Sequence, residues 1–184
     1  MKNTSVLTAL IFVISFSAGA QQKFYTKTGK ISFYSSTAVE NIEAINKSAV
    51  AVLDPKTGDI QFAVLMKGFE FKKALMQEDF NNDYVESSKF PKAEFKGAIT
   101  NNSEINYTTD GTYTAKVKGK LTIHGETQDI EVTGSITVKD GKLQIKSVFN
   151  VQIADYKIVV RKLYKDSISS TIRVTIETTL EPLK

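Results

Sequence analysis

Long runs in which every second residue is apolar constrain the fold of this chain more than any other feature of its sequence. The clearest run ends the stretch from Tyr84 to Gly125, where the apolar positions are Tyr113, Ala115, Val117, Leu121 and Ile123. Thr, Lys and Gly separate these positions, so an extended chain has one apolar face and one polar face. This period of two predicts an antiparallel strand that is buried on one side and solvated on the other.

The same alternation recurs along most of the chain and predicts about eight strands, several of them long. The segment from Glu40 to Leu53 is less regular but is also rich in Val, Ile and Ala. Asp54 to Gly58 and Asp140-Gly141 have the Pro, Asp and Gly residues that tight turns favour. The apolar positions of the other strands are Ile31, Phe33, Ile60, Phe62, Val64, Met66, Ala93, Phe95, Ile99, Ile130, Val132, Ile136, Val138, Leu143, Ile145, Phe149, Val151, Ile153, Ile168, Ile172, Val174, Ile176 and Leu180.

Two local features interrupt the strand pattern. At Gly68 the apolar positions change parity, which predicts a β-bulge. Lys72 to Glu86 is the one convincing helical segment, with Leu75, Phe80 and Tyr84 able to share an apolar side. Asn81 to Asp83 would interrupt it. We therefore expect one or two short helices that lie across a sheet edge or a barrel mouth.

Long strands with one apolar face must bury that face, either in a sandwich of two sheets or in a closed barrel. A sandwich usually has more and shorter strands, whereas about eight long strands joined by hairpins suit an up-and-down barrel. The sequence therefore predicts an all-β fold, an antiparallel barrel of about eight strands. A barrel of this size can be filled by side chains or hold one small ligand, and the pattern leaves both alternatives open.

The first 20 residues have the features of a secretory signal peptide. Lys2 precedes an apolar run from Val6 to Phe16, and the small residues Ala18 to Ala20 follow. The run is too short to span a bilayer as a helix, and we expect no transmembrane segment in the mature chain. The mature domain would comprise residues 21–184 and be periplasmic or secreted. The chain has no cysteine, so it has neither disulfides nor a lipidated cysteine.

Charge and side-chain chemistry argue against several functions. The formal net charge is +4, and Lys residues are spread along the polar strand faces rather than gathered in a stripe, which disfavours nucleic-acid binding. His124 is the single histidine and is expected to be exposed at a turn. We expect no metal site, no cofactor and no catalytic residues. The acids Glu78, Asp79, Asp83 and Glu86 are expected to form the wet face of the helical segment.

Basic residues gather in the connection from Tyr156 to Ser167 and in Lys72-Lys73. Such a cluster at a barrel mouth could meet an anionic headgroup. A solvated surface loop explains it more simply, and we favour that interpretation because most surface charge is of this kind.

Two separated motifs give the chain a family resemblance. Phe71 to Gly97 places a helical turn before an aromatic-Pro pair and a strand, and Val117 to Gly134 contains the hairpin sequence KLTIHGET. Both resemble the YceI-like family of bacterial exported proteins. The resemblance implies a lipocalin-like barrel that binds polyisoprenoid or similar amphiphilic lipids along its axis, without catalysis.

On this resemblance we expect an apolar or amphiphilic lipid to be the partner. The alternative is a filled barrel that acts as a periplasmic protein-interaction module. For each aromatic residue taken alone, ordinary core packing is the simpler interpretation. The residues expected to line a lipid site are Phe33, Phe62, Val64, Phe71, Leu75, Phe80, Phe95, Tyr113, Val117, Leu121, Ile123, Phe149, Val151, Ile172 and Val174.

Overall fold

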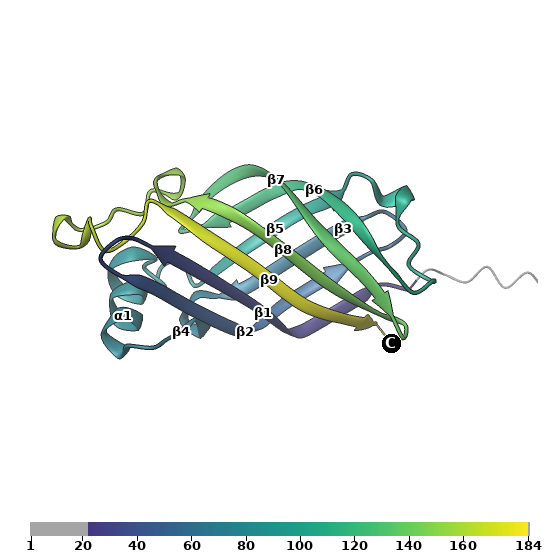
Figure 1. The fold of residues 1–184 in the computed structure, drawn as a ribbon, viewed down its shortest axis with the longest axis horizontal. Helices are drawn as coiled ribbons and strands as arrows, with labels where there is room; N and C mark the ends of the chain where they lie inside the picture. The colour runs from purple at the N-terminus through teal and green to yellow at the C-terminus, as the bar shows by residue number, and fades with distance from the viewer. Residues whose placement is uncertain (1–21, 184) are drawn as a thin grey trace, which may run out of the picture.

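The computed structural model describes residues 22–183, and the predicted signal peptide lies outside them. In this range the chain forms nine strands and one short α-helix, α1 (Ala74–Asp79). We call the end of the barrel that carries α1 and the β8–β9 connection the helix end, and the opposite end, with the β7–β8 hairpin, the turn end (Figure 1). The strands are β1 (Phe24–Ser36), β2 (Asn41–Leu53), β3 (Asp59–Leu65), β4 (Glu70–Phe71), β5 (Lys92–Ile99), β6 (Gly111–Ile123), β7 (Glu126–Lys139), β8 (Lys142–Gln152) and β9 (Thr171–Pro182).

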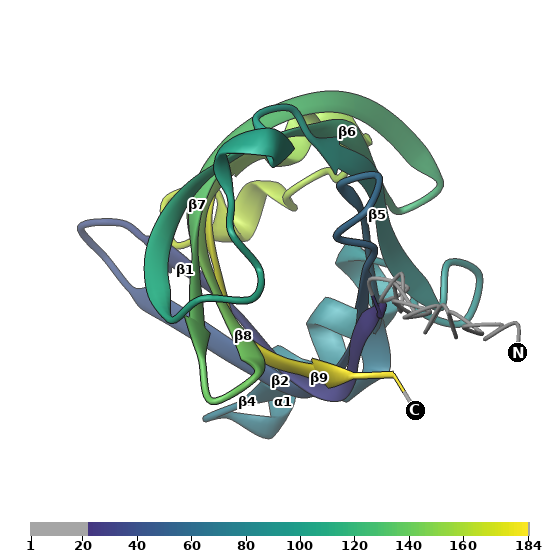
Figure 2. The same ribbon diagram turned by 90° about the vertical axis from the view of Figure 1, so that its right-hand side faces the viewer.

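Eight of the strands close into a ring. Figure 2 shows this ring end-on. The order of its strands is β1-β9-β8-β7-β6-β5-β3-β2, and β2 pairs again with β1. Every pair is antiparallel. The ninth strand, β4, pairs with β2 beyond the point where β3 has left it. The predicted barrel of about eight antiparallel strands is therefore confirmed, and β1, β2 and β6 are each 13 residues long.

The bulge predicted at Gly68 is wrong. β3 ends at Leu65, and a 3-10 turn, Met66–Gly68, carries the chain to β4. The buried side chain of Asn46 stabilises this departure, because its Nδ2 donates to the Leu65 carbonyl at 3.1 Å while its Oδ1 accepts from the Ser48 N–H at 2.8 Å. A Cβ at position 68 would lie 2.6 Å from Asn46 Nδ2, so only glycine allows this approach. The change in the alternation of apolar residues near Gly68 therefore reflects the end of β3 and not a bulge within it.

The predicted helical segment is present as α1 followed directly by a π-helical turn, Phe80–Tyr84. The Val85 N–H donates to the Phe80 carbonyl at 2.9 Å, so the expected interruption is a widened turn rather than a break. Leu75 is 64% exposed and does not join Phe80 and Tyr84 on a buried side. Among the described residues, no helix has the length and apolar character needed to cross a membrane.

The turn-end half of the barrel is a packed core. Leu53, Leu143 and Leu180 are completely buried there. The loop between β5 and β6 covers this core, with the Tyr107 hydroxyl donating to Asn102 Oδ1 at 2.7 Å. Burial raises the pKa of Tyr107 to about 12. Half of the barrel is therefore filled by its own side chains.

Candidate functional site

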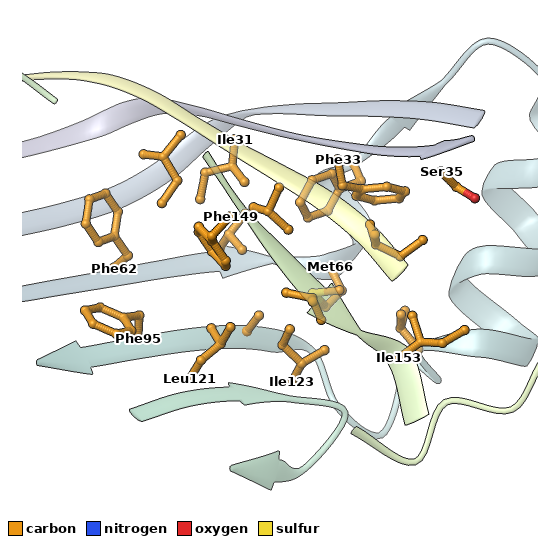
Figure 3. A pocket seen from close by; sticks show the side chains of 18 of the residues that line it. Ile31, Phe33, Ser35, Phe62, Met66, Phe95, Leu121, Ile123, Phe149 and Ile153 are labelled. Atoms are coloured by element: carbon orange, nitrogen blue, oxygen red, sulfur yellow. The ribbon is translucent and has the colours of Figure 1, made fainter. Parts of the chain in front are cut away.

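An apolar cavity of about 460 Å³ occupies the helix-end half of the barrel (Figure 3). Ile60, Ile99 and Ile136, which belong to the packed core, form its floor. Its mouth lies between the β1–β2 turn, α1 and the β8–β9 connection, which contribute Glu40, Leu75 and other residues to the lining. Because the turn end is filled, the cavity is a blind pocket that opens towards the helix end.

Strand pairing places two rows of side chains on the cavity walls. Phe62 on β3 lies opposite Phe95 on β5, and Phe95 lies opposite Leu121 on β6. On other strands, Val174 on β9 lies between Phe33 on β1 and Phe149 on β8. Figure 3 shows Phe62, Phe95 and Leu121 along one side and Phe33 and Phe149 along another. An inner surface of this kind favours a hydrocarbon ligand.

A pair of glycines gives Phe95 its position. Gly97 on β5 and Gly119 on β6 lie opposite each other, and a Cβ at either would come within 2.6 Å of Phe95 Cζ. The two glycines therefore leave a bare strip of backbone, and the Phe95 ring lies over it. This flattening against the wall keeps the ring from filling the centre of the barrel.

A cluster of four phenylalanines holds the helix end together. Phe33 from β1 packs against Phe69 and Phe80 with ring centroids 5.2 and 5.4 Å apart, and Phe71 from β4 lies 5.0 Å from Phe80. Such tilted and edge-on contacts are the favoured geometries for aromatic pairs. The cluster fixes the π-helical turn against the barrel and at the same time forms one side of the cavity.

The structure brings nearly all of the predicted lipid-site residues to this cavity. Every one of them except Tyr113 lines it. Tyr113 packs against the filled core instead, and its hydroxyl donates to the Thr109 carbonyl at 3.3 Å. Whether the lining residues contact a ligand stays a prediction.

Sequence reasoning missed several lining residues. Ile31 and Ile176 have the same strand parity as predicted neighbours and could have been included on that signal. Phe69 follows the 3-10 turn, and Ile158 and Val160 lie in the β8–β9 connection, so no strand period marked them. Alternation identifies inward residues only where the chain is a regular strand.

Arg161 ties the β8–β9 connection to the helical segment across the mouth. Its guanidinium lies 3.3 Å from an Asp79 oxygen and 3.0 Å from an Asp83 oxygen, and it stacks on the Tyr164 ring at 5.2 Å. Burial raises the pKa of the Tyr84 hydroxyl, and the adjacent Arg161 guanidinium offsets part of that rise. Two segments far apart in sequence are thus fixed on either side of the opening.

Other cations of the predicted basic cluster are also paired with acids. Lys73 lies 2.5 Å from Glu40, and Lys157 lies 2.7 Å from Glu126. The cluster is therefore only partly free to meet an anionic headgroup. Lys162 and Lys165 have no acidic partner within residues 22–183, and both are exposed.

The prediction that His124 is an exposed turn residue is wrong. Its side chain is 12% exposed, and it lies between two acceptors, the Glu86 carboxylate at 2.8 Å from Nε2 and the Tyr156 carbonyl at 3.0 Å from Nδ1. The Phe90 ring packs edge-on against the imidazole. A doubly protonated imidazole donates to both acceptors at once. His124 thus joins the β6–β7 turn to two other segments of the helix end.

This contact predicts how acid affects stability. The hydrogen bond from His124 is the main reason that the pKa of Glu86 lies below its usual value of 4.5. A carboxyl group with a lower pKa in the folded than in the unfolded chain stabilises the fold above its unfolded pKa, and this contribution is lost as the pH falls through the folded pKa. Glu86→Gln should therefore be less stable than the wild type near neutral pH, and the difference should shrink below pH 4.5.

Thermal unfolding midpoints measured from neutral to acidic pH test this expectation, with Glu78→Gln, an exposed acid of α1, as the matched control. Parallel curves for the wild type and Glu86→Gln would contradict it.

Three of the four acids predicted for the wet face of the helical segment make structural contacts, while Glu78 is exposed as expected. Asp79 and Asp83 pair with Arg161, and Glu86 pairs with His124. Among residues 22–183 there is no group of three or more His, Cys, Asp or Glu side chains that could hold a metal ion. The site thus offers an apolar container with a polar rim.

Solved structures of three bacterial proteins share this barrel. The first is a polyisoprenoid-binding domain from Saccharophagus degradans implicated in plant cell wall breakdown, with a TM-score of 0.77, 13% identity, and coverage of 89% of this chain and 99% of that one. BcnA from Burkholderia cenocepacia has a TM-score of 0.67 and 18% identity, covering 82% and 95% of the two chains. The YceI protein of Campylobacter jejuni has a TM-score of 0.56 and 16% identity, covering 100% and 99%.

Sequence comparison agrees with the fold. No curated protein matches this chain at a significant level. The family model of the YceI-like domain, however, matches residues 13–180, which is nearly the whole chain. The motifs that suggested this family lie within the matched range and build the cavity wall and the helix end. The chain therefore belongs to the YceI-like domain family.

Proposed function

We propose that this protein binds one amphiphilic lipid of the polyisoprenoid class, with the tail in the cavity and the headgroup at the mouth, and that it does so without catalysis. The observation that carries the proposal is the blind apolar cavity above a filled barrel floor. Family membership and the fold shared with a polyisoprenoid-binding domain support the same ligand class.

The size of the cavity limits the length of the tail. A cavity of about 150 Å³ holds one benzene molecule of six carbons. On that scale 460 Å³ accommodates roughly 18 carbons, or between three and four isoprene units. A longer chain would leave its remainder at or beyond the mouth.

The energetics suit exchange rather than permanent capture. Each methylene moved from water into the cavity gains about 0.8 kcal/mol, so a tail of this size is held strongly against water. A bilayer is equally apolar and offers nearly the same gain. The protein would therefore act as a carrier or buffer that takes up and releases lipid.

A chain-length series tests the proposal. Prenyl alcohols of two to eight isoprene units are titrated against the protein loaded with a fluorescent apolar probe. Affinity should rise steeply up to about four units and then level off, because further units find no additional buried surface. Failure of every alcohol to displace the probe, or an equally steep rise through eight units, would count against a blind lipid cavity.

We further propose that the mature protein acts in the periplasm or outside the cell. The basic start, short apolar run and small residues of positions 1–20 support export.

The alternative function, a wholly filled barrel that acts as a periplasmic protein-interaction module, has less support, because a packed interior is confined to the turn-end half.

A further inference from the structure

We propose that the helix end of the barrel is a docking surface for an anionic lipid bilayer, with the cavity mouth facing the membrane. Its centre is the outer tip of the β8–β9 connection, which we define as residues Val159 to Lys165. This connection projects beyond the barrel wall at the helix end (Figure 1). The proposed contact concerns the outside of the protein and does not depend on what the cavity holds.

Apolar side chains that face solvent surround the mouth. Val159 is 77% exposed and Leu163 is 83% exposed, more than any other large hydrophobic residue within positions 22–183. Val39 on the β1–β2 turn and Leu75 on α1 are 66% and 64% exposed. These three segments form the sides of the mouth. Exposed apolar residues around one opening are candidates for a surface that binds a partner.

The tip is built to present these residues outwards. Ile158 and Val160 line the cavity, while Val159 between them faces solvent. In the same way Tyr164 lines the cavity and Leu163 faces solvent. Arg161 holds the tip to the helical segment through Asp79 and Asp83. The exposed side chains therefore sit on an anchored support and cannot turn inwards without breaking these contacts.

The positive charge of the tip favours an anionic bilayer as the partner. Residues 157–166 contain four cations and one acid. Glu126 pairs with Lys157, and Asp79 and Asp83 pair with Arg161, so the positive charge left for a partner is that of Lys162 and Lys165. Lys162 and Lys165, which flank Leu163 and Tyr164, are exposed and have no acidic partner in the described part of the chain. Apolar side chains beside free lysines are the pattern of segments that insert into the interface of an anionic bilayer.

A bilayer also fits the shape of the surface better than a protein does. Specific protein interfaces usually bury about 1,200 Å² or more in a continuous patch. Here the apolar residues come from three separate segments around an opening. If the proposed lipid binding holds, docking would also let a tail pass between bilayer and cavity without crossing water.

Vesicle sedimentation tests the docking surface directly. The full mature protein is mixed with vesicles of phosphatidylcholine, with or without phosphatidylglycerol. The wild type should bind the anionic vesicles and lose that binding as salt is added. Val159→Glu combined with Leu163→Glu, and separately Lys162→Glu combined with Lys165→Glu, should each weaken binding about tenfold or more, because the first pair loses the apolar contact with the bilayer and the second loses the attraction to anionic headgroups.

Matched controls carry the same changes elsewhere on the barrel. Val148→Glu alters an apolar residue of the β8 wall that is 58% exposed, and Lys47→Glu with Lys116→Glu alters exposed lysines of β2 and β6. Both controls should bind like the wild type. Equal binding to neutral and anionic vesicles, no binding at all, or tip variants that behave like the controls would overturn the proposal; in the second case a protein partner would become the better occupant.

Displacement of an apolar probe in solution, without vesicles, separates docking from ligand binding. The tip variants should bind the probe like the wild type, because Val159, Leu163, Lys162 and Lys165 do not line the cavity. Loss of probe binding in a tip variant would contradict the division between cavity and docking surface.

Discussion

Leu143→Ala is expected to lower the free energy of unfolding by about 3 kcal/mol, because truncating a fully buried leucine leaves a cavity that its neighbours fill only in part. Leu143 is completely buried in the turn-end core, where it belongs to the same cluster as Ile136 and Leu180. Urea denaturation measures the change. Binding of an apolar probe should survive in this variant, because Leu143 does not line the cavity.

Phe149→Ala is the matched comparison from the helix-end half. Phe149 already borders open space, so its removal enlarges an existing cavity instead of creating one. The cost should lie below the about 3–5 kcal/mol that is usual for a phenylalanine in a packed core. If Phe149→Ala cost as much as that and probe binding were unchanged, the barrel would be filled along its whole length, contrary to a hollow helix-end half.

Val174→Trp is expected to lower the affinity for an apolar ligand by about 100-fold or more. Val174 lies between Phe33 and Phe149 on the cavity wall, so the indole would project into the space that the tail needs. Displacing four methylenes costs about 3 kcal/mol, which corresponds to more than a hundredfold in affinity. Titration with a fluorescent apolar probe measures the loss.

Val148→Trp controls for the substitution itself. Val148 precedes Phe149 on β8 and faces solvent, so the same indole on the outer wall leaves the cavity unchanged. Both variants should remain folded by circular dichroism. Wild-type affinity in Val174→Trp would mean that the ligand binds elsewhere.

The fold could be predicted from the sequence because the alternation of apolar and polar residues within each strand indicates which of its faces is buried. Alternation at Phe62 and Phe149 placed these side chains on the inner wall, and the Asp140-Gly141 pair marked a hairpin. The pair has positive φ angles of 52° and 70°, which a tight two-residue turn requires. Strand period and turn chemistry are local signals, so they can be recognised in the sequence without knowledge of the tertiary structure.

The division of the barrel into a filled and a hollow half could not be predicted. Leu143 and Phe149 share one face of β8, yet the first is in the packed core and the second borders the cavity. The difference depends on what projects from the other strands, including the bare glycine pair at Gly97 and Gly119. Packing across the barrel depends on several strands at once, so the alternation within one strand does not predict it.

His124 shows where parity reasoning ends. Its neighbours Leu121 and Ile123 are on a regular strand, but His124 itself has a φ angle of 51°. Alternation of side-chain direction holds only for extended backbone. At this left-handed turn the imidazole is directed towards Glu86 instead of solvent, and a contact between segments 38 residues apart in sequence decides its environment.

Mass spectrometry of lipid extracted from the purified mature protein shows directly whether the helix-end half of the barrel is a lipid-binding cavity. The wild type and the variants Val174→Trp and Val148→Trp are each purified without detergent from the cells that express them. We expect about one equivalent of a prenyl-type amphiphile with the wild type and Val148→Trp, and little or none with Val174→Trp. No lipid in the wild type together with no binding of an apolar probe, or equal lipid in all three proteins, would contradict this expectation.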